Sequence, residues 1–549
     1  MDGVEYNLEL EEETTFITRD KIRKHKSGQN SEFDDIFETL GDLGFYQLWV
    51  YVMSNVLEIS ATLSVMYFVF ECADPGWKCA SIECENSCVN LSLPNSTDGF
   101  CSTEDLVCIN RTFNPTLTSA LTEWNLVCRN LWKAKTIISI FFAAVGVGAI
   151  IGGQVSDTFG RRWSLFIVWI MLSIFQTCLR FAPNYYVYCV IRVITGIFAG
   201  ALDCISPVLS LEWMSPKWRI IASWRFSWQT SLMFIALLAY LCRDWQTLTT
   251  AVGLITIPLF PLYYFFFPES SRWLVQKGRF EKAEYWIRKA MWFNRLSPRT
   301  DLREFLENVA RTENKRQERT VPYTYLDLFH NRKMSIWTIV LIYETFTLAI
   351  SWYGINSSIS SLTGNIYSNV AVSGIGAFVI GLLSIYVINW VGRVKSYVLF
   401  ISLTGCCLIV ILAMKVTDVA HNNPMVVTYF SLASISLMTG GWCAARISCW
   451  ELYPTLMRNI ATGCVSMGTK LGSIISPFII LLATFHGSIP YVIFATASFS
   501  SGILAFLSIP ETKNKPLPDG LPSRNNQKTK PFAKCSDSRG FNQEGLECT

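Results

Sequence analysis

The sequence GGQVSDTFGRR, residues 152–162, lies between two long apolar runs and contains an Asp, a Gly and two Arg within a few positions. A damaged copy, NWVGRVK, occupies residues 389–395 and again separates two apolar runs. A loop this short leaves no room for a folded domain. Its recurrence between hydrophobic segments predicts a membrane protein built from two related halves.

The composition excludes an ordinary soluble protein. Of the 549 residues, 51% are apolar and only 16% are charged, against the ~25% charged residues of typical globular domains. A helix needs about twenty apolar residues to cross a membrane. The sequence predicts twelve such spans, at about 45–70, 134–155, 163–182, 185–209, 221–241, 246–267, 335–355, 366–390, 396–416, 424–448, 459–484 and 489–509.

The spans and the polar segments between them predict five regions. We expect no cleavable signal, because the first ~40 residues are polar and the first span can serve for insertion. Apolar residues recur at helical spacing in the segment that joins the halves (Trp286, Ile287, Ala290 and Phe293), which predicts short amphipathic helices on the membrane face. The expected regions are a cytosolic N-terminal tail (1–42), a first six-helix half (43–267), a basic helical linker (268–333), a second six-helix half (334–509) and a cytosolic C-terminal tail (510–549).

The loop after the first span, residues 71–131, combines crowded cysteines with three N-x-S/T sequons at Asn90, Asn95 and Asn110. This combination predicts an oxidised, glycosylated extracellular loop. The irregular spacing and the absence of His argue against a zinc site. Six paired cysteines allow fifteen connectivities and the seventh can stay free, so no pairing is assigned. The disulfide candidates are Cys72, Cys79, Cys84, Cys88, Cys101, Cys108 and Cys128.

Positive charge gathers in the short loops of one side of the predicted bundle. That side receives the two charged hairpins and the basic linker, and the other side receives the cysteine-rich loop. Since cytoplasmic loops carry an excess of Lys and Arg, the basic side should be cytosolic, with both termini. The sequons lead independently to the same orientation.

Two further features recur in both halves. Glu212 precedes Arg219 by seven residues and Glu451 precedes Arg458 by seven, while PES at 268–270 is echoed by PET at 510–512. A carboxylate and an Arg near helix ends can pair with each other and with helix dipoles. We therefore interpret the hairpins as conformational latches; alternatively, the charges only set topology. The latch residues are Gly153, Asp157, Gly160, Arg161, Arg162, Glu212, Arg219, Asn389, Gly392, Arg393, Glu451 and Arg458.

Four motifs resemble a known family. The sequence GQVSDTFGRR at 153–162 resembles the loop signature of the major facilitator superfamily, and RVITGIFAG at 192–200 resembles its fourth-helix motif. More narrowly, PESSRWL at 268–274 and WELYPTLMRN at 450–459 resemble the organic cation/anion/zwitterion transporters, solute carrier family 22.

The cysteine- and sequon-rich loop matches that family too, and the resemblance covers about residues 40–515. It implies an all-α membrane protein with twelve transmembrane helices in two pseudo-symmetric six-helix halves, the major facilitator fold. One departure is Asn389, which occupies the acidic position of the second-half loop and should weaken that latch.

Ionisable residues within spans are costly and should face protein or a water-filled path. They are Glu58, Arg192, Asp203, Arg225, Glu344, Arg446 and Lys470. Arg192 and Asp203 are interpreted as structural. Lys470 is the most informative, because a lone ammonium in a low-dielectric cavity attracts anions. In the resembled family, cation carriers tend to have an Asp at the matching position and anion carriers a basic residue.

These charges lean toward organic anions, with Arg446 as a second positive centre. Glu344 could neutralise Arg446 or Lys470, or bind a cation itself; alternatively, Lys470 and Glu344 form a structural or gating pair. Trp352 and Tyr353 are added as substrate-binding candidates because the family has an aromatic-Gly pair in its substrate path. Packing is an equally good explanation of these two rings.

The function expected from these features is secondary transport. No P-loop is present and the four His are scattered, so we expect no ATP-driven pump, no metal, no cofactor and no enzyme. The expected function is polyspecific transport of small organic ions, leaning to anions, across the plasma membrane by alternating access. The expected partners are these ions, the lipid bilayer and a possible co-transported or exchanged ion, with no nucleic acid. The alternatives are an organic cation or carnitine-like zwitterion transporter, a proton- or sodium-coupled transporter of another organic solute, and a transport-inactive receptor or scaffold.

Overall fold

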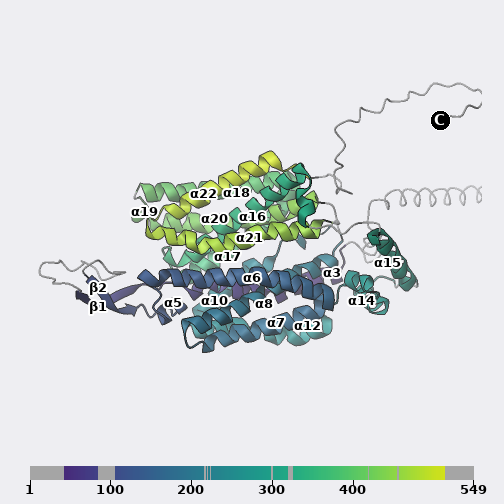
Figure 1. The fold of residues 1–549 in the computed structure, drawn as a ribbon, viewed down its shortest axis with the longest axis horizontal. Helices are drawn as coiled ribbons and strands as arrows, with labels where there is room; N and C mark the ends of the chain where they lie inside the picture. The colour runs from purple at the N-terminus through teal and green to yellow at the C-terminus, as the bar shows by residue number, and fades with distance from the viewer. Residues whose placement is uncertain are drawn as a thin grey trace, which may run out of the picture.

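The computed structural model shows two helical bundles that lie side by side (Figure 1). It describes residues 43–84, 106–215, 218, 221–222, 224–297, 301–318, 325–417, 419–453 and 457–513. Among these residues, eleven helices are long and apolar enough to cross a membrane, and a twelfth apolar helix, Phe226–Cys242, has 17 residues. The predicted major facilitator fold, with two six-helix halves, is confirmed.

The first half contains the spans that precede the linker. Asn184 caps one of them, because its side chain accepts a hydrogen bond from the N–H of Val187 at 3.0 Å. The last span of this half is assembled from two shorter helices. The elements are α3 (Phe45–Met66) with α4 (Phe68–Glu71), α5 (Ala120–Glu123), α6 (Leu131–Phe159), α7 (Arg161–Cys178), α8 (Tyr185–Glu212), α10 (Phe226–Cys242), α11 (Trp245–Leu254) and α12 (Phe260–Phe266).

The linker and the second half follow. Trp286, Ile287 and Ala290, predicted to share a helix face, are all buried on α14. The linker helices are α13 (Ser271–Gln276), α14 (Phe280–Phe293) and α15 (Leu302–Glu318). The second half has α16 (Arg332–Ser357), α17 (Ile366–Val391), α18 (Arg393–Val416), α19 (Val419–Asn422), α20 (Pro424–Leu452), α21 (Arg458–Leu481) and α22 (Ile489–Ser508).

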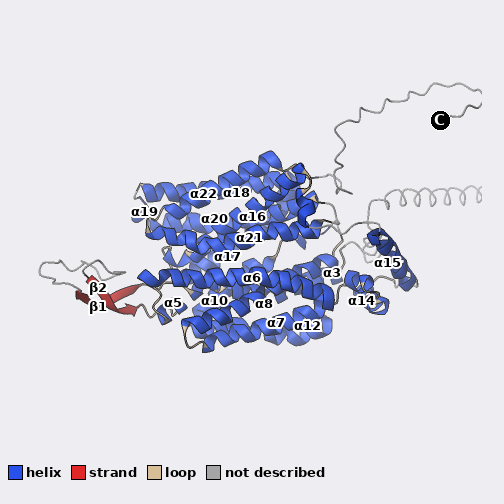
Figure 2. Cartoon of the chain, viewed as in Figure 1, coloured by secondary structure: helices blue, strands red, loops and turns tan. Residues whose placement is uncertain are grey.

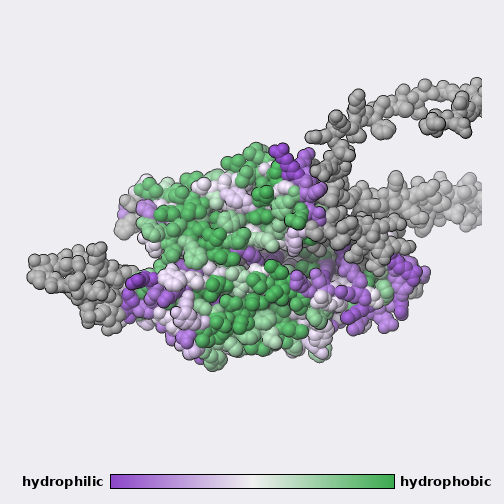
Figure 3. Space-filling view, viewed as in Figure 1, coloured by the Kyte–Doolittle hydropathy of each residue, from purple (hydrophilic) through white to green (hydrophobic). Residues whose placement is uncertain are grey.

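The two ends of the molecule differ. At one end, strands β1 (Trp77–Cys84) and β2 (Leu106–Phe113) pair antiparallel, with Trp77 opposite Phe113, and this is the sheet drawn in Figure 2. At the other end lie α14 and α15. Figure 3 shows apolar surface over both bundles and polar surface toward the two ends, as a membrane-spanning body requires. We call these the sheet end and the linker end.

The predicted disulfide loop is described only in part. Cys79 and Cys128 each take part in a disulfide, whereas Cys72 is a buried free thiol that donates to the carbonyl of Ala134 at 3.5 Å. Of the seven predicted disulfide candidates, Cys72 is thus free in the described structure. Asn110 and Cys108 lie on β2 and Cys84 ends β1. Asn90, Asn95, Cys88 and Cys101 lie outside the described residues, as do both tails beyond 43–513.

Glycines bring helices of each half close together. A Cβ at Gly200 of α8 would collide with the carbonyl of Val145 on α6, and one at Gly468 of α21 would collide with the carbonyl of Ile342 on α16. Small residues let backbones touch where lipid supplies no hydrophobic drive to pack helices. The halves themselves meet where α6 faces α21, and Ser139 there donates to the carbonyl of Ile474 at 2.8 Å.

Candidate functional site

The first latch is centred on Arg161, the first residue of α7. Its Nε and Nη2 donate to the two carboxylate oxygens of Glu212 at 3.2 and 3.1 Å, and Nη2 also lies 2.8 Å from Asp157 Oδ1. Glu212 ends α8 and Asp157 belongs to the last turns of α6. One guanidinium therefore ties three helices together at the linker end, with the bidentate geometry that makes Arg–carboxylate pairs strong.

Glu269, in the segment after α12, completes this latch. Its Oε1 accepts the backbone N–H of Arg161 at 2.8 Å and of Arg162 at 3.2 Å, which places a negative charge at the N-terminus of α7. Burial raises the pKa of Glu269, and the backbone hydrogen bonds and Arg161 oppose that rise. The preceding Gly160 has φ +101°, and a Cβ there would lie 2.6 Å from Glu269 Oε2. Only glycine leaves room for the carboxylate.

The second half repeats the arrangement around Arg393. Its Nε donates to Glu451 Oε2 at 2.9 Å and its Nη2 to Oε1 at 2.9 Å. Glu511 Oε1 accepts the backbone N–H of Arg393 at 2.7 Å, at the N-terminus of α18. Gly392 has φ +121°, and a Cβ there would lie 2.5 Å from Glu511 Oε2. The Pro-Glu motifs that repeat in the sequence are thus the carboxylate caps of these turns.

The two latches differ at the position singled out in the sequence. Asn389 is exposed where Asp157 lies in the first copy, and Arg393 takes its bidentate partner from Glu451. Thr512 adds a hydroxyl bond to Glu451 at 2.6 Å. The described ion pairs of both latches join helices of the same half. They hold the helix ends of each half together rather than one half to the other.

The remaining predicted latch residues take other places. Arg162 donates to the carbonyl of Tyr264 and lies 5.4 Å from the ring of Trp286, which attaches α7 to α12 and to the linker. Gly153 lies on α6, where a Cβ would approach Cys204 of α8 at 3.9 Å. Arg458 begins α21. Arg219 lies outside the described residues. In the described ion pairs, Glu212 and Glu451 pair with the hairpin arginines Arg161 and Arg393.

A second charged cluster lies at mid-depth. Arg225, just before α10, donates through Nη2 to Glu58 Oε1 on α3 and to Asp203 Oδ1 on α8, the latter at 2.6 Å. Ser227 donates to the same Glu58 oxygen at 3.0 Å. Three helices of the first half are joined by one cation held between two carboxylates.

Lys470 extends this cluster across the two halves. Its Nζ lies 3.6 Å from Asp203 Oδ2, and the side chains are 23% and 14% exposed although Lys470 lies midway along α21 and Asp203 well inside α8. The expectation of a lone ammonium at Lys470 is therefore wrong. The partner comes from the other half, because α21 packs against α6 and places Lys470 over Gly146 beside α8. We call Glu58, Asp203, Arg225 and Lys470 the central charge cluster.

Glu344 does not neutralise a cation. It is 1% exposed on α16, and in the described part of the chain it forms no ion pair with Arg446 or Lys470. The expected neutralisation of Arg446 or Lys470 by Glu344 is therefore wrong. The alternative of a Lys470–Glu344 pair is wrong too, because Lys470 turns toward the first half. Arg446, on α20, is half-buried and donates through Nε to the carbonyl of Trp442 at 3.2 Å.

Trp352 and Tyr353 lie where the halves touch. The ring of Tyr353 is 4.6 Å from Phe142 of α6 and 6.1 Å from Phe68 of α4, and Trp352 is 6.1 Å from Trp228 of α10. Both rings are buried. In this state they fill the contact between the halves, which is the packing explanation of these residues.

One functional-looking ion pair escaped the sequence reasoning. Arg192 of α8 donates through Nε and Nη2 to the two oxygens of Glu71 at 2.8 and 3.0 Å, and both side chains are fully buried. Tyr188 donates to the same carboxylate at 2.7 Å. Glu71 was missed because it lies just past the predicted end of the first span. The signal in the sequence was an acid directly after an apolar run.

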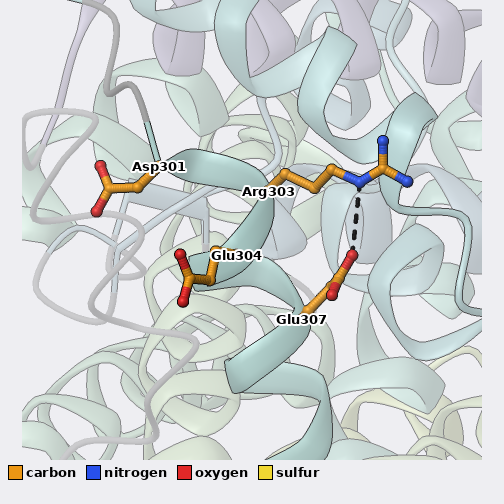
Figure 4. A pocket seen from close by; sticks show the side chains of 4 residues that line it. All are labelled: Asp301, Arg303, Glu304 and Glu307. Atoms are coloured by element: carbon orange, nitrogen blue, oxygen red, sulfur yellow. Dashed lines mark hydrogen bonds and ion pairs between the residues drawn. The ribbon is translucent and has the colours of Figure 1, made fainter.

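A surface hollow on the linker is separate from these clusters. It is lined by Asp301, Arg303, Glu304 and Glu307 at the start of α15 (Figure 4). Arg303 turns away from Asp301 and bonds Glu307 at 3.5 Å. All four side chains belong to one short stretch of the linker, so this hollow is not a site between the halves.

Known proteins resemble the chain over most of its length. The family described as sugar (and other) transporter matches residues 110–519. The chain is 28% identical to the organic cation transporter protein of Drosophila melanogaster, covering 93% of this chain and 98% of that protein. It is 30% identical to the organic cation/carnitine transporter 2 of Homo sapiens, covering 74% and 71%. The fold resembles the inward open conformation of the xylose transporter XylE from E. coli, with a TM-score of 0.61 at 15% identity over 86% of this chain and 98% of that one.

Proposed function

Because the chain belongs to the major facilitator superfamily and, within it, to the organic cation, anion and zwitterion transporters of solute carrier family 22, we propose that it carries an organic ion with a cationic group across the membrane by alternating access. Organic cations and carnitine-like zwitterions are the proposed substrates. The names of the relatives support this choice over the lean to anions that Lys470 suggested.

The ion pair between Asp203 and Lys470 carries the proposal. At 3.6 Å it is longer than a strong charge-assisted hydrogen bond, which is about 2.7–2.9 Å. It joins the two halves at mid-depth, where substrates of such transporters bind. Its partial exposure at that depth indicates that water reaches it. A loose, wet ion pair at this position is one that a charged substrate can enter.

In this proposal, the substrate and Lys470 compete for Asp203. A substrate ammonium that reaches Asp203 replaces Lys470 there and releases the lysine. In the central charge cluster with the nearby Arg446, the cations Arg225, Arg446 and Lys470 outnumber the carboxylates Glu58 and Asp203. A substrate that also carries a carboxylate can therefore pair with the released Lys470, which favours a zwitterion. Both exchanges break one ion pair and form another, so the cost of removing the charges from water is limited.

Aromatic contacts join the two halves at the sheet end. Phe70 stacks on Tyr367 with ring centroids 5.8 Å apart, and Tyr240 lies 5.7 Å from the same ring. These contacts close the sheet end. The latches keep the linker end of each half rigid, so the halves can rock as bodies around the central charge cluster.

We further propose that the linker end faces the cytosol and that the sheet end faces outward from the plasma membrane. The charged hairpins and the basic linker gather at the linker end, as the excess of Lys and Arg in cytoplasmic loops requires. Glycosidase treatment of the full chain from cells checks this orientation. A chain whose loop between β1 and β2 never gains a glycan would argue against it.

The experiment that tests the function is uptake by cells that express the full chain. The panel contains labelled organic cations, zwitterions and anions, with surface expression measured in parallel. Wild-type protein should take up cations or zwitterions. Asp203→Asn should remove an interaction with a charged group that contributes about 1.5–3 kcal/mol, which is about a 10- to 150-fold loss of affinity. Lys470→Met should raise the affinity for simple cations, because their competitor is gone, and lower that for zwitterions.

Lys277→Met is the matched control, since Lys277 is an exposed lysine of the linker. It should leave uptake unchanged. Uptake of anions alone, unaffected by Asp203→Asn, would refute the assignment of Asp203. A chain that reaches the surface and carries no member of the panel would support the receptor or scaffold alternative instead.

A further inference from the structure

A stripe of polar side chains runs along α16 inside the second half. Glu344, Thr347 and Ser351 are spaced by three and four residues, which places them on one face of the helix. All three are buried. The hydroxyl oxygens of Thr347 and Ser351 have no hydrogen-bond partner in the described structure. Buried polar atoms are normally bonded, so such a group of exceptions requires an explanation.

The other buried acids of the bundle have cations beside them. Glu71 holds Arg192, and Glu58 holds Arg225. Glu344 is as deeply buried, at 1% exposure, and no basic side chain of the described chain lies within ion-pair distance. An isolated carboxylate in a low-dielectric interior becomes neutral by taking up a proton. The second half thus contains an acid whose charge depends on a proton rather than on a partner side chain.

The neighbours of Glu344 supply hydroxyl and thiol groups, not cations. They are Tyr343 on the same helix, Tyr397 on α18, and Cys449 and Tyr453 at the end of α20. Tyr397 bonds Ser501 of α22 at 2.6 Å and Tyr343 bonds Ser500 at 2.7 Å, so both phenols are already engaged.

Two further titratable groups lie on α21, which packs against α16. They are Cys464 and Arg458. Glu344 itself is 1% exposed. A protonated Glu344 has a hydroxyl hydrogen to donate, and water can carry a hydrogen bond from it to the unpartnered hydroxyl of Thr347, one turn along α16.

We propose that Glu344 is a proton-binding site and that the proton it binds crosses the membrane with the substrate. The carboxylate takes one proton from water on the outer side and returns it to water on the cytosolic side, so each cycle moves one positive charge in addition to the net charge of the substrate. The proposal rests on the proposed transport function. The link to transport is α16 itself, whose Trp352 and Tyr353 contact the first half. When the halves rock, α16 changes its surroundings, and the access of water to Glu344 changes with it.

The test uses purified full-length protein in vesicles of neutral and anionic phospholipid, loaded with a pH-sensitive dye. Adding a substrate identified in the uptake panel should acidify the vesicle interior, and uptake should rise when the outside is made more acidic. Glu344→Gln keeps the neutral shape of the protonated acid. It should abolish both effects while exchange of labelled for unlabelled substrate continues. Tyr343→Phe, one residue away, should keep both effects.

Each outcome bears on one claim. Substrate uptake by the wild type with no proton movement overturns the proton site and leaves the transport proposal standing. Uptake driven by a sodium gradient, and lost in Glu344→Gln, would also overturn it by making the site one for Na⁺. The absence of any uptake would refute the transport proposal itself. If Glu344→Gln does not fold, proton movement by the wild type and by Glu344→Asp decides the matter, and both should acidify the vesicles.

Discussion

The substitution Gly160→Ala disturbs the turn between α6 and α7 in two ways. The backbone at Gly160 has φ +101° and ψ 156°, a region that essentially only glycine occupies. The added Cβ would also lie 2.6 Å from Glu269 Oε2 and 3.1 Å from the ring of Trp273. The backbone must change its conformation, or the carboxylate must leave the N-terminus of α7.

The magnitude follows from these two effects. Holding a residue with a side chain in such a conformation costs about 1–3 kcal/mol. Displacing Glu269 breaks its bonds to the N–H groups of Arg161 and Arg162, and a hydrogen bond to a charged group contributes about 1.5–3 kcal/mol. Because one relaxation relieves both problems in part, we expect a total loss of about 3 kcal/mol rather than the full sum. The same reasoning applies to Gly392→Ala, which faces Glu511.

Thermal unfolding of the detergent-solubilised full chain, followed by tryptophan fluorescence, measures this loss. Gly278→Ala is the matched control, because Gly278 has φ +69° but no atom lies within 4 Å of the position of an added Cβ. It should cost about 1–2 kcal/mol, the backbone contribution alone. The melting temperature should therefore fall further for Gly160→Ala than for Gly278→Ala. Equal falls would show that the carboxylate cap adds nothing and would refute the account of this turn.

Two further substitutions test the ion pairs. Glu71→Gln leaves Arg192 buried without its counter-charge and should lower the free energy of unfolding by about 3–5 kcal/mol. Glu307→Gln, at a largely exposed ion pair on the linker, should lower it by about 1 kcal/mol or less. Chemical unfolding measures both variants, and similar unfolding midpoints would contradict this reasoning. Asn389→Asp places a second carboxylate in the last turn of α17, four residues before Arg393, and should add about 0.2–1 kcal/mol in low salt. That gain should vanish in high salt, and a gain that survives would point to a cause other than charge.

The sequence predicted the fold well because membrane spans are a local property. Twenty apolar residues in succession have few alternatives to a membrane helix, since each backbone polar group must be bonded within the segment. The twelve predicted spans therefore correspond to apolar helices of the structure, including the short α10. Helices were also expected in the linker and were found there, since α14 repeats its buried residues at helical spacing.

The charged groups were harder to interpret. The repeat identified Arg161, Glu212, Arg393 and Glu451 as a related set, and the structure brings them together in pairs. The role of Glu269 could not be predicted, because its oxygens bind backbone N–H groups that every sequence has. The charge argument for Lys470 failed for a similar reason: its partner, Asp203, lies on another helix of the other half.

By itself, the sequence determined what is local: the apolar spans, the glycine-centred charged turns and their duplication. Each depends on residues that are neighbours along the chain, where hydropathy and backbone conformation act. Only the tertiary structure decided which charge meets which. Pairing depends on distances of a few ångströms between side chains from different helices, and those distances are set by how α6, α8 and α21 pack. The same packing leaves Glu344 without a cation, although nothing in its sequence surroundings distinguishes it from Glu58 or Glu71.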